Sequence, residues 1–154
     1  MIAEGTGSGD GHGTGSAMNK QLAGEKFALL DGEVLRMQGY VVYVRGRVSI
    51  VPGDGYLTTR RFVFCRKPRL PLGLGEFLRG RKIVFAFALE ELQSIVQQRH
   101  GLGRTHLLKL RNTAEFEIQF GSRREGWLLA FGAAIRQIRP GTAPRYRREL
   151  IEFA

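Results

Sequence analysis

The stretch of sequence that decides the fold is "GDGYLTTRRFVF", residues 53–64. It places two threonines and two arginines between two segments rich in the aromatic and branched residues that favour β-strands. Thr58 to Arg61 therefore predicts a tight hairpin corner, with Thr59 and Arg60 at the turn and with Thr58 and Arg61 fixing its geometry. An arginine exposed at such a turn is also free to meet an anion, so Arg60 and Arg61 are candidate ligand-binding residues.

Strand-like segments continue on both sides of this corner. The clearest is "AEFEIQF", residues 114–120, in which apolar residues alternate with Glu115, Glu117 and Gln119. The others are "EVLRMQGYVVYV" (33–44), "RVSIVPGDGYLT" (47–58), "RFVFC" (61–65), "KIVFAFA" (82–88), "ELQSIVQQ" (91–98) and "THLLKL" (105–110). Together they predict about seven strands of antiparallel character.

One amphipathic helix follows the strands, from about residue 122 to 139. Ser122 and Glu125 have the spacing of a capping box, and Pro140-Gly141 ends the pattern. The helix carries an apolar stripe made of Trp127, Leu128, Phe131, Ala134, Ile135 and Ile138. A seven-stranded sheet of this size curls to bury its apolar face, and we expect the Trp127 stripe to plug its open end.

Four motifs in this order resemble the GRAM and bacterial PH-like domains of the pleckstrin-homology superfamily. They are Gly32-Glu33-x-Leu35, Leu57-Thr58-x-x-Arg61-Phe62-Val63-Phe64, Leu89-Glu90-Glu91-Leu92-Gln93-Ser94-Ile95, and the final helix with its buried tryptophan. The resemblance covers residues 32–139 and implies a mainly β, PH-like barrel or sandwich of seven antiparallel strands, capped by the amphipathic helix. Gly55 departs from the pattern because these families carry an apolar residue there, and the loop from Pro68 to Arg81 is longer than theirs.

The domain limits follow from changes in composition. Residues 1–19 are dominated by Gly, Ser and Thr and predict a flexible leader or expression scar. Residues 25–139 form the expected domain, and residues 140–154 a basic amphipathic tail, either a solvated end or a short helix. The single cysteine, Cys65, lies in a strand pattern and is expected to be a buried thiol in a reducing compartment.

Net charge limits the class of partner. The 154 residues contain 24 Lys and Arg against 14 Asp and Glu, a formal charge of +10. This excess favours an anionic partner: a phospholipid surface, an acidic protein or nucleic acid. No apolar run is long enough for a membrane-spanning helix. We therefore expect a cytoplasmic protein, either free or peripheral at the inner face of the membrane.

Signals of catalysis and of cofactor binding are lacking. The sequence contains no phosphate-binding loop, no nucleophile elbow and no Cys/His pairing with zinc spacing. His100 and His106 are separated by a glycine turn and predict one exposed and one sheet-borne imidazole rather than a metal pair. We predict no catalytic residue, no cofactor and no metal.

Candidate binding residues gather in two further segments. The segment 66–82, "RKPRLPLGLGEFLRGRK", sets leucines and a phenylalanine among cations, a pattern suited to a peripheral membrane protein. The candidates there are Arg66, Lys67, Arg69, Leu72, Leu74, Phe77, Arg79, Arg81 and Lys82. Arg45 and Arg47, at the predicted turn between the first two strands, complete the set. Packing of the leucines against the barrel, with the charges merely solvated, is an equal alternative.

Two other functions remain open from the sequence. A nucleic-acid-binding domain would need exposed aromatic rings for stacking, for which Tyr40, Tyr43 and Tyr56 are the candidates. A protein-interaction or self-association module would need no anion at all.

Overall fold

The computed structural model describes residues 23–67, 82–101 and 103–153. The strands are β1 (Leu35–Arg45), β2 (Ser49–Thr58), β3 (Arg61–Arg66), β4 (Ile83–Ala88), β5 (Leu92–His100), β6 (Gly103–Leu110), β7 (Glu115–Phe120), β8 (Arg145–Arg147) and β9 (Leu150–Glu152). A 3-10 turn, η1 (Leu89–Glu91), joins β4 to β5, and one α-helix, α3 (Arg124–Ile138), follows β7 within these residues. The expected leader, residues 1–19, lies outside this range.

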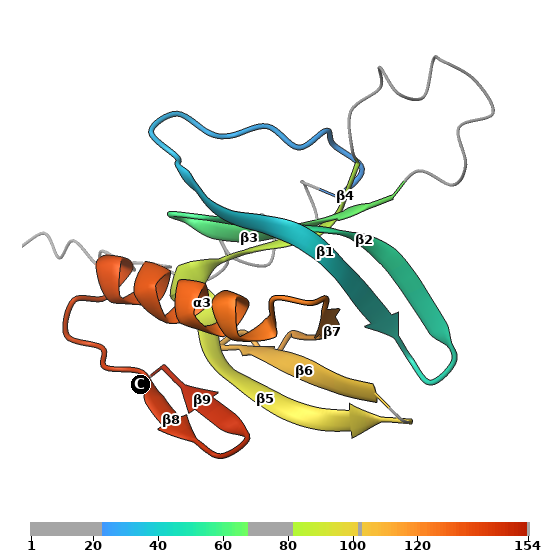
Figure 1. Ribbon diagram of the computed structural model, residues 1–154. Coiled ribbons are helices and arrows are strands. Elements are labelled where there is room, and N and C mark those ends of the chain that lie inside the picture. Colours follow the sequence, from blue (N-terminus) through green and yellow to red (C-terminus); the bar gives the residue numbers. More distant parts are fainter. Residues whose placement is uncertain (1–22, 68–81, 102, 154) are drawn as a thin grey trace, which may run out of the picture.

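The strands form one antiparallel sheet in the order β4-β3-β2-β1-β7-β6-β5-β9-β8. β1 connects its two halves, because it pairs along its whole length with β2 and only through Val41–Val44 with β7. The sheet consequently bends at β1 into two layers, and α3 lies across the open side between them (Figure 1). The predicted mainly β fold, with a helix after the seven strands, is confirmed, and two short strands are added to it.

The core lies between the layers and is rich in aromatic rings. Phe85 stacks on Phe116 with ring centroids 4.2 Å apart, and Trp127 of α3 stacks on Phe120 at 5.4 Å. Trp127 is only 1% exposed and also meets Phe62 edge-on at 6.0 Å. The predicted plug of the barrel by Trp127 is therefore confirmed.

Gly55, the departure noted in the sequence, has a packing explanation. A β-carbon at this position would lie 2.9 Å from Cγ2 of Val41 and 3.0 Å from the ring of Phe62. The phenylalanine ring already occupies the space that an apolar side chain at position 55 would need. The core is therefore filled at this point although residue 55 has no side chain.

The start of α3 differs from the prediction. The N-cap residue is Arg123 rather than Ser122, and its side chain makes no capping hydrogen bond within the described residues. The capping box is therefore not formed, although Glu125 still lies in the first turn, where its charge suits the helix dipole. At the other end, the guanidinium of Arg139 donates to the carbonyls of Leu92 (2.8 Å) and Phe153 (3.2 Å) and so joins α3 to β5 and the C-terminal hairpin.

The sequence predicted a solvated end or a short helix for residues 140–154, but Arg145–Arg147 and Leu150–Glu152 form the β8–β9 hairpin. β9 adds to the edge of β5, with Ile95 opposite Ile151. Ile151 and Phe153 alternate along the chain and are 7% and 1% exposed. Burial of these two side chains beside β5 explains why the segment is a strand.

A second, smaller core lies on the outer face of β2, β3 and β4. Residues 23–33, which we call the strap, cross this face (Figure 1) and bond to Ile83 through the amide of Gly24 and the carbonyl of Glu25. Phe27 of the strap stacks on Tyr56 with ring centroids 4.3 Å apart. Cys65 is fully buried beneath the strap, and this burial raises the pKa of its thiol to about 12. The predicted buried thiol is confirmed.

Candidate functional site

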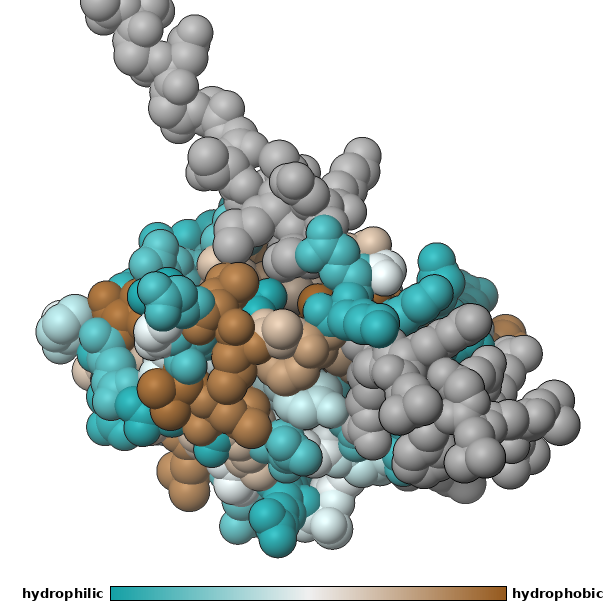
Figure 2. Space-filling model, turned by 90° about the horizontal axis from the view of Figure 1, so that it is seen from above, coloured by the Kyte–Doolittle hydropathy of each residue, from teal (hydrophilic) through white to brown (hydrophobic). Residues whose placement is uncertain are grey.

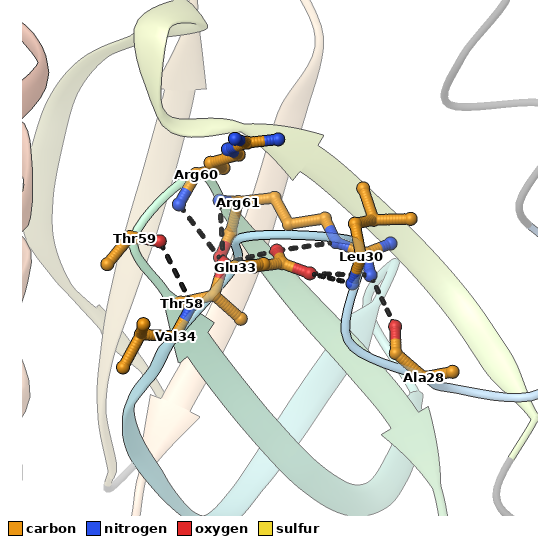
Figure 3. Close-up of polar contacts among 8 residues, drawn as sticks. All are labelled: Ala28, Leu30, Glu33, Val34, Thr58, Thr59, Arg60 and Arg61. Atoms are coloured by element: carbon orange, nitrogen blue, oxygen red, sulfur yellow. Dashed lines mark hydrogen bonds and ion pairs between the residues drawn. The ribbon is translucent and has the colours of Figure 1, made fainter.

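The corner at Thr58–Arg61 is the tight turn that the sequence predicts. β2 ends at Thr58 and β3 begins at Arg61, so that Thr59 and Arg60 form the turn. The hydroxyl of Thr58 accepts hydrogen bonds from the amides of Arg60 (3.1 Å) and Arg61 (3.0 Å). The same hydroxyl donates to the carboxylate of Glu33 at 2.5 Å (Figure 3).

Arg61 is not the exposed turn arginine that the sequence suggested. Its Nε donates to Glu33 Oε1 at 2.9 Å, and its Nη2 donates to Glu33 Oε2 at 3.0 Å and to the carbonyl of Ala28 at 2.7 Å. The residue is 3% exposed because the strap crosses the face to which it points. Arg61 is thus an internal clamp on the strap, whereas Arg60 remains exposed.

Glu33 is the partner that the sequence reasoning missed. Burial by itself raises the pKa of its carboxyl, but hydrogen bonds from Arg61, from the Leu30 amide and from Thr58, together with the positive charge of Arg61, outweigh this cost. The pKa consequently lies below its ordinary value, and Glu33 is ionised at neutral pH. Glu33, Thr58 and Arg61 all belong to the motifs that carry the resemblance. Their place in these motifs is the sequence signal from which the cluster could have been found.

Three exposed cations lie at the other end of β3. The amide of Lys67 donates to the carbonyl of Pro52 (3.1 Å), and the amide of Arg66 to the carbonyl of Lys82 (3.4 Å). The ammonium of Lys67 lies 5.0 Å from the ring centroid of Tyr40. The chain therefore brings Arg66, Lys67 and Lys82 together where β3 ends and β4 begins.

The β1–β2 hairpin ends in a basic and apolar tip, residues 45–50. Arg45 and Arg47 are exposed on either side of Gly46, whose φ of 70° closes the turn. The sequence predicted these two arginines at this turn, but it did not identify Val48 and Ile50 as surface residues. Their side chains are 94% and 65% exposed.

The predicted ligand residues therefore separate into two places. Pro52, which bonds to Lys67, lies about 10 Å along β2 from Ser49 at the tip, since a strand rises about 3.3 Å per residue. Arg60 and Arg61 lie at the far end of β2, about 30 Å from the tip. Arg69, Leu72, Leu74, Phe77, Arg79 and Arg81 lie outside the described residues.

The nucleic-acid alternative loses two of its three stacking candidates. Tyr43 packs among the core rings of Phe64 and Phe85, and Tyr56 is 8% exposed beneath the strap. Only Tyr40, 46% exposed, is open to a base. A continuous stacking surface is therefore not available from these three residues.

The two histidines of the β5–β6 hairpin lie on opposite faces of the sheet. His106 is 2% exposed and packs against the ring of Phe120, whereas His100 lies 3.3 Å from the carboxylate of Glu117 on the outer face. Across residues 23–67, 82–101 and 103–153, no group of three or more His, Cys, Asp or Glu residues is arranged to hold a metal ion. Within the same residues, no helix has the length and apolarity to span a membrane.

Comparisons with known proteins support the fold alone. No protein-family model and no curated protein sequence matches the chain. Among solved structures, the C-terminal domain of an unknown protein from Leishmania infantum matches with a TM-score of 0.50 and 14% identity, over 68% of this chain and 85% of that one. The linker-DH/PH domains of p115-RhoGEF match with a TM-score of 0.51 and 9% identity, over 68% of this chain and 30% of that one.

A structure of Vav1 with an allosteric inhibitor gives a TM-score of 0.52 and 15% identity, over 75% of this chain and 32% of that one. This chain thus spans about a third of the length of the p115-RhoGEF and Vav1 structures. With identities this low, the likeness carries no more than the architecture. The architecture is PH-like.

Proposed function

We propose that this chain is a non-catalytic PH-like binding module that engages an anionic phospholipid surface through the β1–β2 tip and the cations beside it. The observation that carries the proposal is the tip itself, where Val48 and Ile50 are 94% and 65% exposed next to Arg45 and Arg47. Aliphatic side chains held this far out of the core are costly in water and are stabilised in the acyl boundary of a bilayer.

The magnitudes suit reversible binding. Burying a valine or isoleucine side chain contributes about 1.5–3 kcal/mol, and each basic residue near an anionic surface about 1 kcal/mol. Arg66, Lys67 and Lys82 lie close enough to add to the attraction of the two tip arginines. The summed binding free energy exceeds that of a single weak anchor, and it is far smaller than that of a permanently inserted segment.

We propose that the loop from Pro68 to Arg81 also contributes to the membrane-binding surface. It leaves the sheet at Lys67 and returns at Lys82, both at the same end of β3 and β4. Its cations Arg69, Arg79 and Arg81 would add to the basic surface, and Leu72, Leu74 and Phe77 would insert. The closer relationship to GRAM and bacterial PH-like domains, and a location at the inner face of the cytoplasmic membrane, remain predictions of the same kind.

Co-sedimentation with liposomes tests the proposal. We expect the chain to pellet with vesicles of phosphatidylcholine and phosphatidylserine at low salt, and to be released as salt screens the charges. Val48→Asp, and separately Arg45→Glu with Arg47→Glu, should abolish pelleting without changing the melting temperature. Arg79→Glu with Arg81→Glu tests the loop in the same assay.

A matched control removes the effect of overall charge. Arg145 and Arg147 are exposed on β8, and Arg145→Glu with Arg147→Glu changes the net charge by the same amount as the tip reversal. This control should still pellet. If the wild-type chain stays in the supernatant, or if the two reversals weaken binding equally, the membrane proposal fails, and a protein-interaction or self-association module becomes the better account.

A further inference from the structure

A second exposed apolar surface lies at the opposite end of β1 from the tip. It consists of side chains from the strap and from the start of β1, and we call it the strap patch. Its members and exposed fractions are Leu29 (48%), Leu30 (41%), Val34 (55%) and Leu35 (36%). Figure 2 shows apolar side chains gathered on this face of the molecule, with hydrophilic groups beside them.

The strap patch is held in one conformation by the buried polar corner beneath it. The amide of Leu30 donates to Glu33 Oε2 (2.8 Å), and the amide of Glu33 donates to the carbonyl of Leu30 (3.0 Å). The amide of Val34 donates to the hydroxyl of Thr59 (3.1 Å). Both ends of the turn that carries Leu30 and Val34 are thus fixed (Figure 3). A surface fixed before binding loses little entropy when a partner arrives.

Helix α3 borders the same surface. A β-carbon on Gly126 would lie 3.5 Å from the thioether methyl of Met37, and Gln137 accepts a hydrogen bond from Arg36 (2.5 Å). The helix therefore runs alongside the start of β1. Leu129 of this helix is 64% exposed.

Two guanidinium groups at the edge of the strap patch have no carboxylate partner among the residues that the structure describes. Arg60 lies over the strap, with Nη2 3.5 Å from the place of a β-carbon on Gly32, and Arg36 donates to the neutral amide of Gln137. Neither forms an ion pair with a residue that the structure describes. Asp31 is exposed in the same turn, so the charge around the strap patch remains positive on balance.

We propose that the strap patch docks an amphipathic segment of an acidic protein partner. Aliphatic side chains of that segment would cover Leu29, Leu30 and Val34, and its carboxylates would pair with Arg60 and Arg36. A second copy of this chain is a poor occupant, because each copy carries a formal charge of +10 and would bring guanidinium groups to guanidinium groups.

The strap patch lies far enough from the tip for both surfaces to be occupied at the same time. β1 has 11 residues, which separates the strap patch from the tip by about 33 Å. An occupant of one surface therefore leaves the other free. The chain could bind a partner through the strap patch whatever the ligand of the tip is.

A pair of synthetic peptides tests the inference on the full chain. The first, about 15 residues long, carries leucines at helical spacing bordered by glutamates, and the second carries lysines in place of the glutamates. We expect fluorescence anisotropy to show saturable binding of the acidic peptide only. Methyl NMR signals of Leu29, Leu30 and Val34 should shift during the titration, while those of Val48 should not.

Substitutions test whether the acidic peptide binds at the strap patch. Val34→Glu should lower the affinity for the acidic peptide at least about tenfold, the equivalent of about 1.4 kcal/mol. Arg60→Glu should lower this affinity in a salt-dependent way. Val48→Glu is the matched control, since it adds the same charge to an exposed valine at the other end of β1, and it should leave peptide binding unchanged. Melting temperatures of all three variants should match the wild type.

Other outcomes overturn the proposal, and each can be told apart from failure of the membrane proposal. Equal binding of the lysine peptide, no saturable binding of the acidic one, or full binding by Val34→Glu excludes an acidic partner at this surface. A dimer seen by light scattering and lost in Val34→Glu would assign the strap patch to a second copy. Liposome binding lost in Val34→Glu but kept in Val48→Glu would assign it to lipid.

Discussion

The carboxylate of Glu33 and the guanidinium of Arg61 form a buried ion pair between residues 28 positions apart in the chain, with Nε 2.9 Å from Oε1. The side chains are 0% and 4% exposed, respectively. This pair joins the strap to the β2–β3 hairpin and so determines where Leu30 and Val34 are presented. Removing either charge leaves the other buried without compensation, which is far more costly than removing both.

The Glu33–Arg61 pair should therefore show strong coupling in unfolding experiments. We expect Glu33→Gln or Arg61→Met to lower the free energy of unfolding in urea by about 3 kcal/mol each, and the double variant Glu33→Leu with Arg61→Met to cost less than their sum. The folded-state pKa of Glu33 is depressed, so its contribution is present above the ordinary carboxyl pKa and is lost as pH falls through the folded value. A cost below 1 kcal/mol for Glu33→Gln would contradict the role given to the pair.

Trp127 should be among the most sensitive positions of the helix. It is 1% exposed and contacts the rings of Phe62, Phe120 and Phe131, so that Trp127→Ala leaves a cavity and should cost about 3–5 kcal/mol. Leu129→Ala, on the same helix but 64% exposed, is the matched control and should change stability by less than about 0.5 kcal/mol. Chemical denaturation of the two variants side by side checks this difference.

His106 should make stability depend on pH in mildly acidic solution. Burial, reinforced by the positive charge of Arg124, lowers the pKa of its imidazole from 6.5 to about 4, and neither ring nitrogen has a hydrogen-bond partner in the part of the chain that the structure describes. Between these values the unfolded chain binds a proton that the folded chain does not, so stability falls as pH drops from 6.5 to 4, by up to about 3 kcal/mol.

His106→Leu should remove this slope while preserving stability near neutral pH, because it fills the site without an unpaired polar atom. Urea midpoints measured across the range, for the wild type and the variant, provide the comparison. Parallel curves for the two proteins would show that another group is responsible.

The C-terminal hairpin should behave as part of the domain. Phe153 is 1% exposed, its amide donates to the carbonyl of Gln93 (2.9 Å), and its own carbonyl accepts from Arg139. We expect Phe153→Ala to cost about 3 kcal/mol or more. Tyr146→Ala, in the same hairpin at a position 55% exposed, should cost clearly less. Equal melting temperatures for the two variants would mean that the tail does not contribute to the core.

The strands and the helix could be predicted because each carries its own periodicity. Alternation in residues 114–120 and the stripe from Trp127 to Ile138 are local patterns that tertiary contacts then reinforced. The β8–β9 hairpin was missed because its strands have three residues each, too few for a period to be distinguished from that of a helix.

The site was less predictable because it depends on contacts between distant segments. The turn at Thr58–Arg61 is local and was predicted, but the burial of Arg61 requires the strap, which lies 28 residues earlier. Exposure of Val48 and Ile50 was missed for a related reason: their apolar character favours burial, and their place at the hairpin tip leaves the two side chains 94% and 65% exposed.

The pairing of β1 with β7 has a consequence for how the chain reaches this structure. Val41 and Phe120, about 80 residues apart, must meet before the barrel closes, whereas β2, β3 and β4 each pair with a strand close by in sequence. Bringing distant segments together carries an entropic cost that local hairpins avoid, and sheets dominated by such pairings refold in milliseconds to seconds. The local hairpins, β6–β7 among them, should therefore gain protection from hydrogen exchange ahead of the β1–β7 ladder, and the closure at Val41 and Phe120 should set the refolding rate.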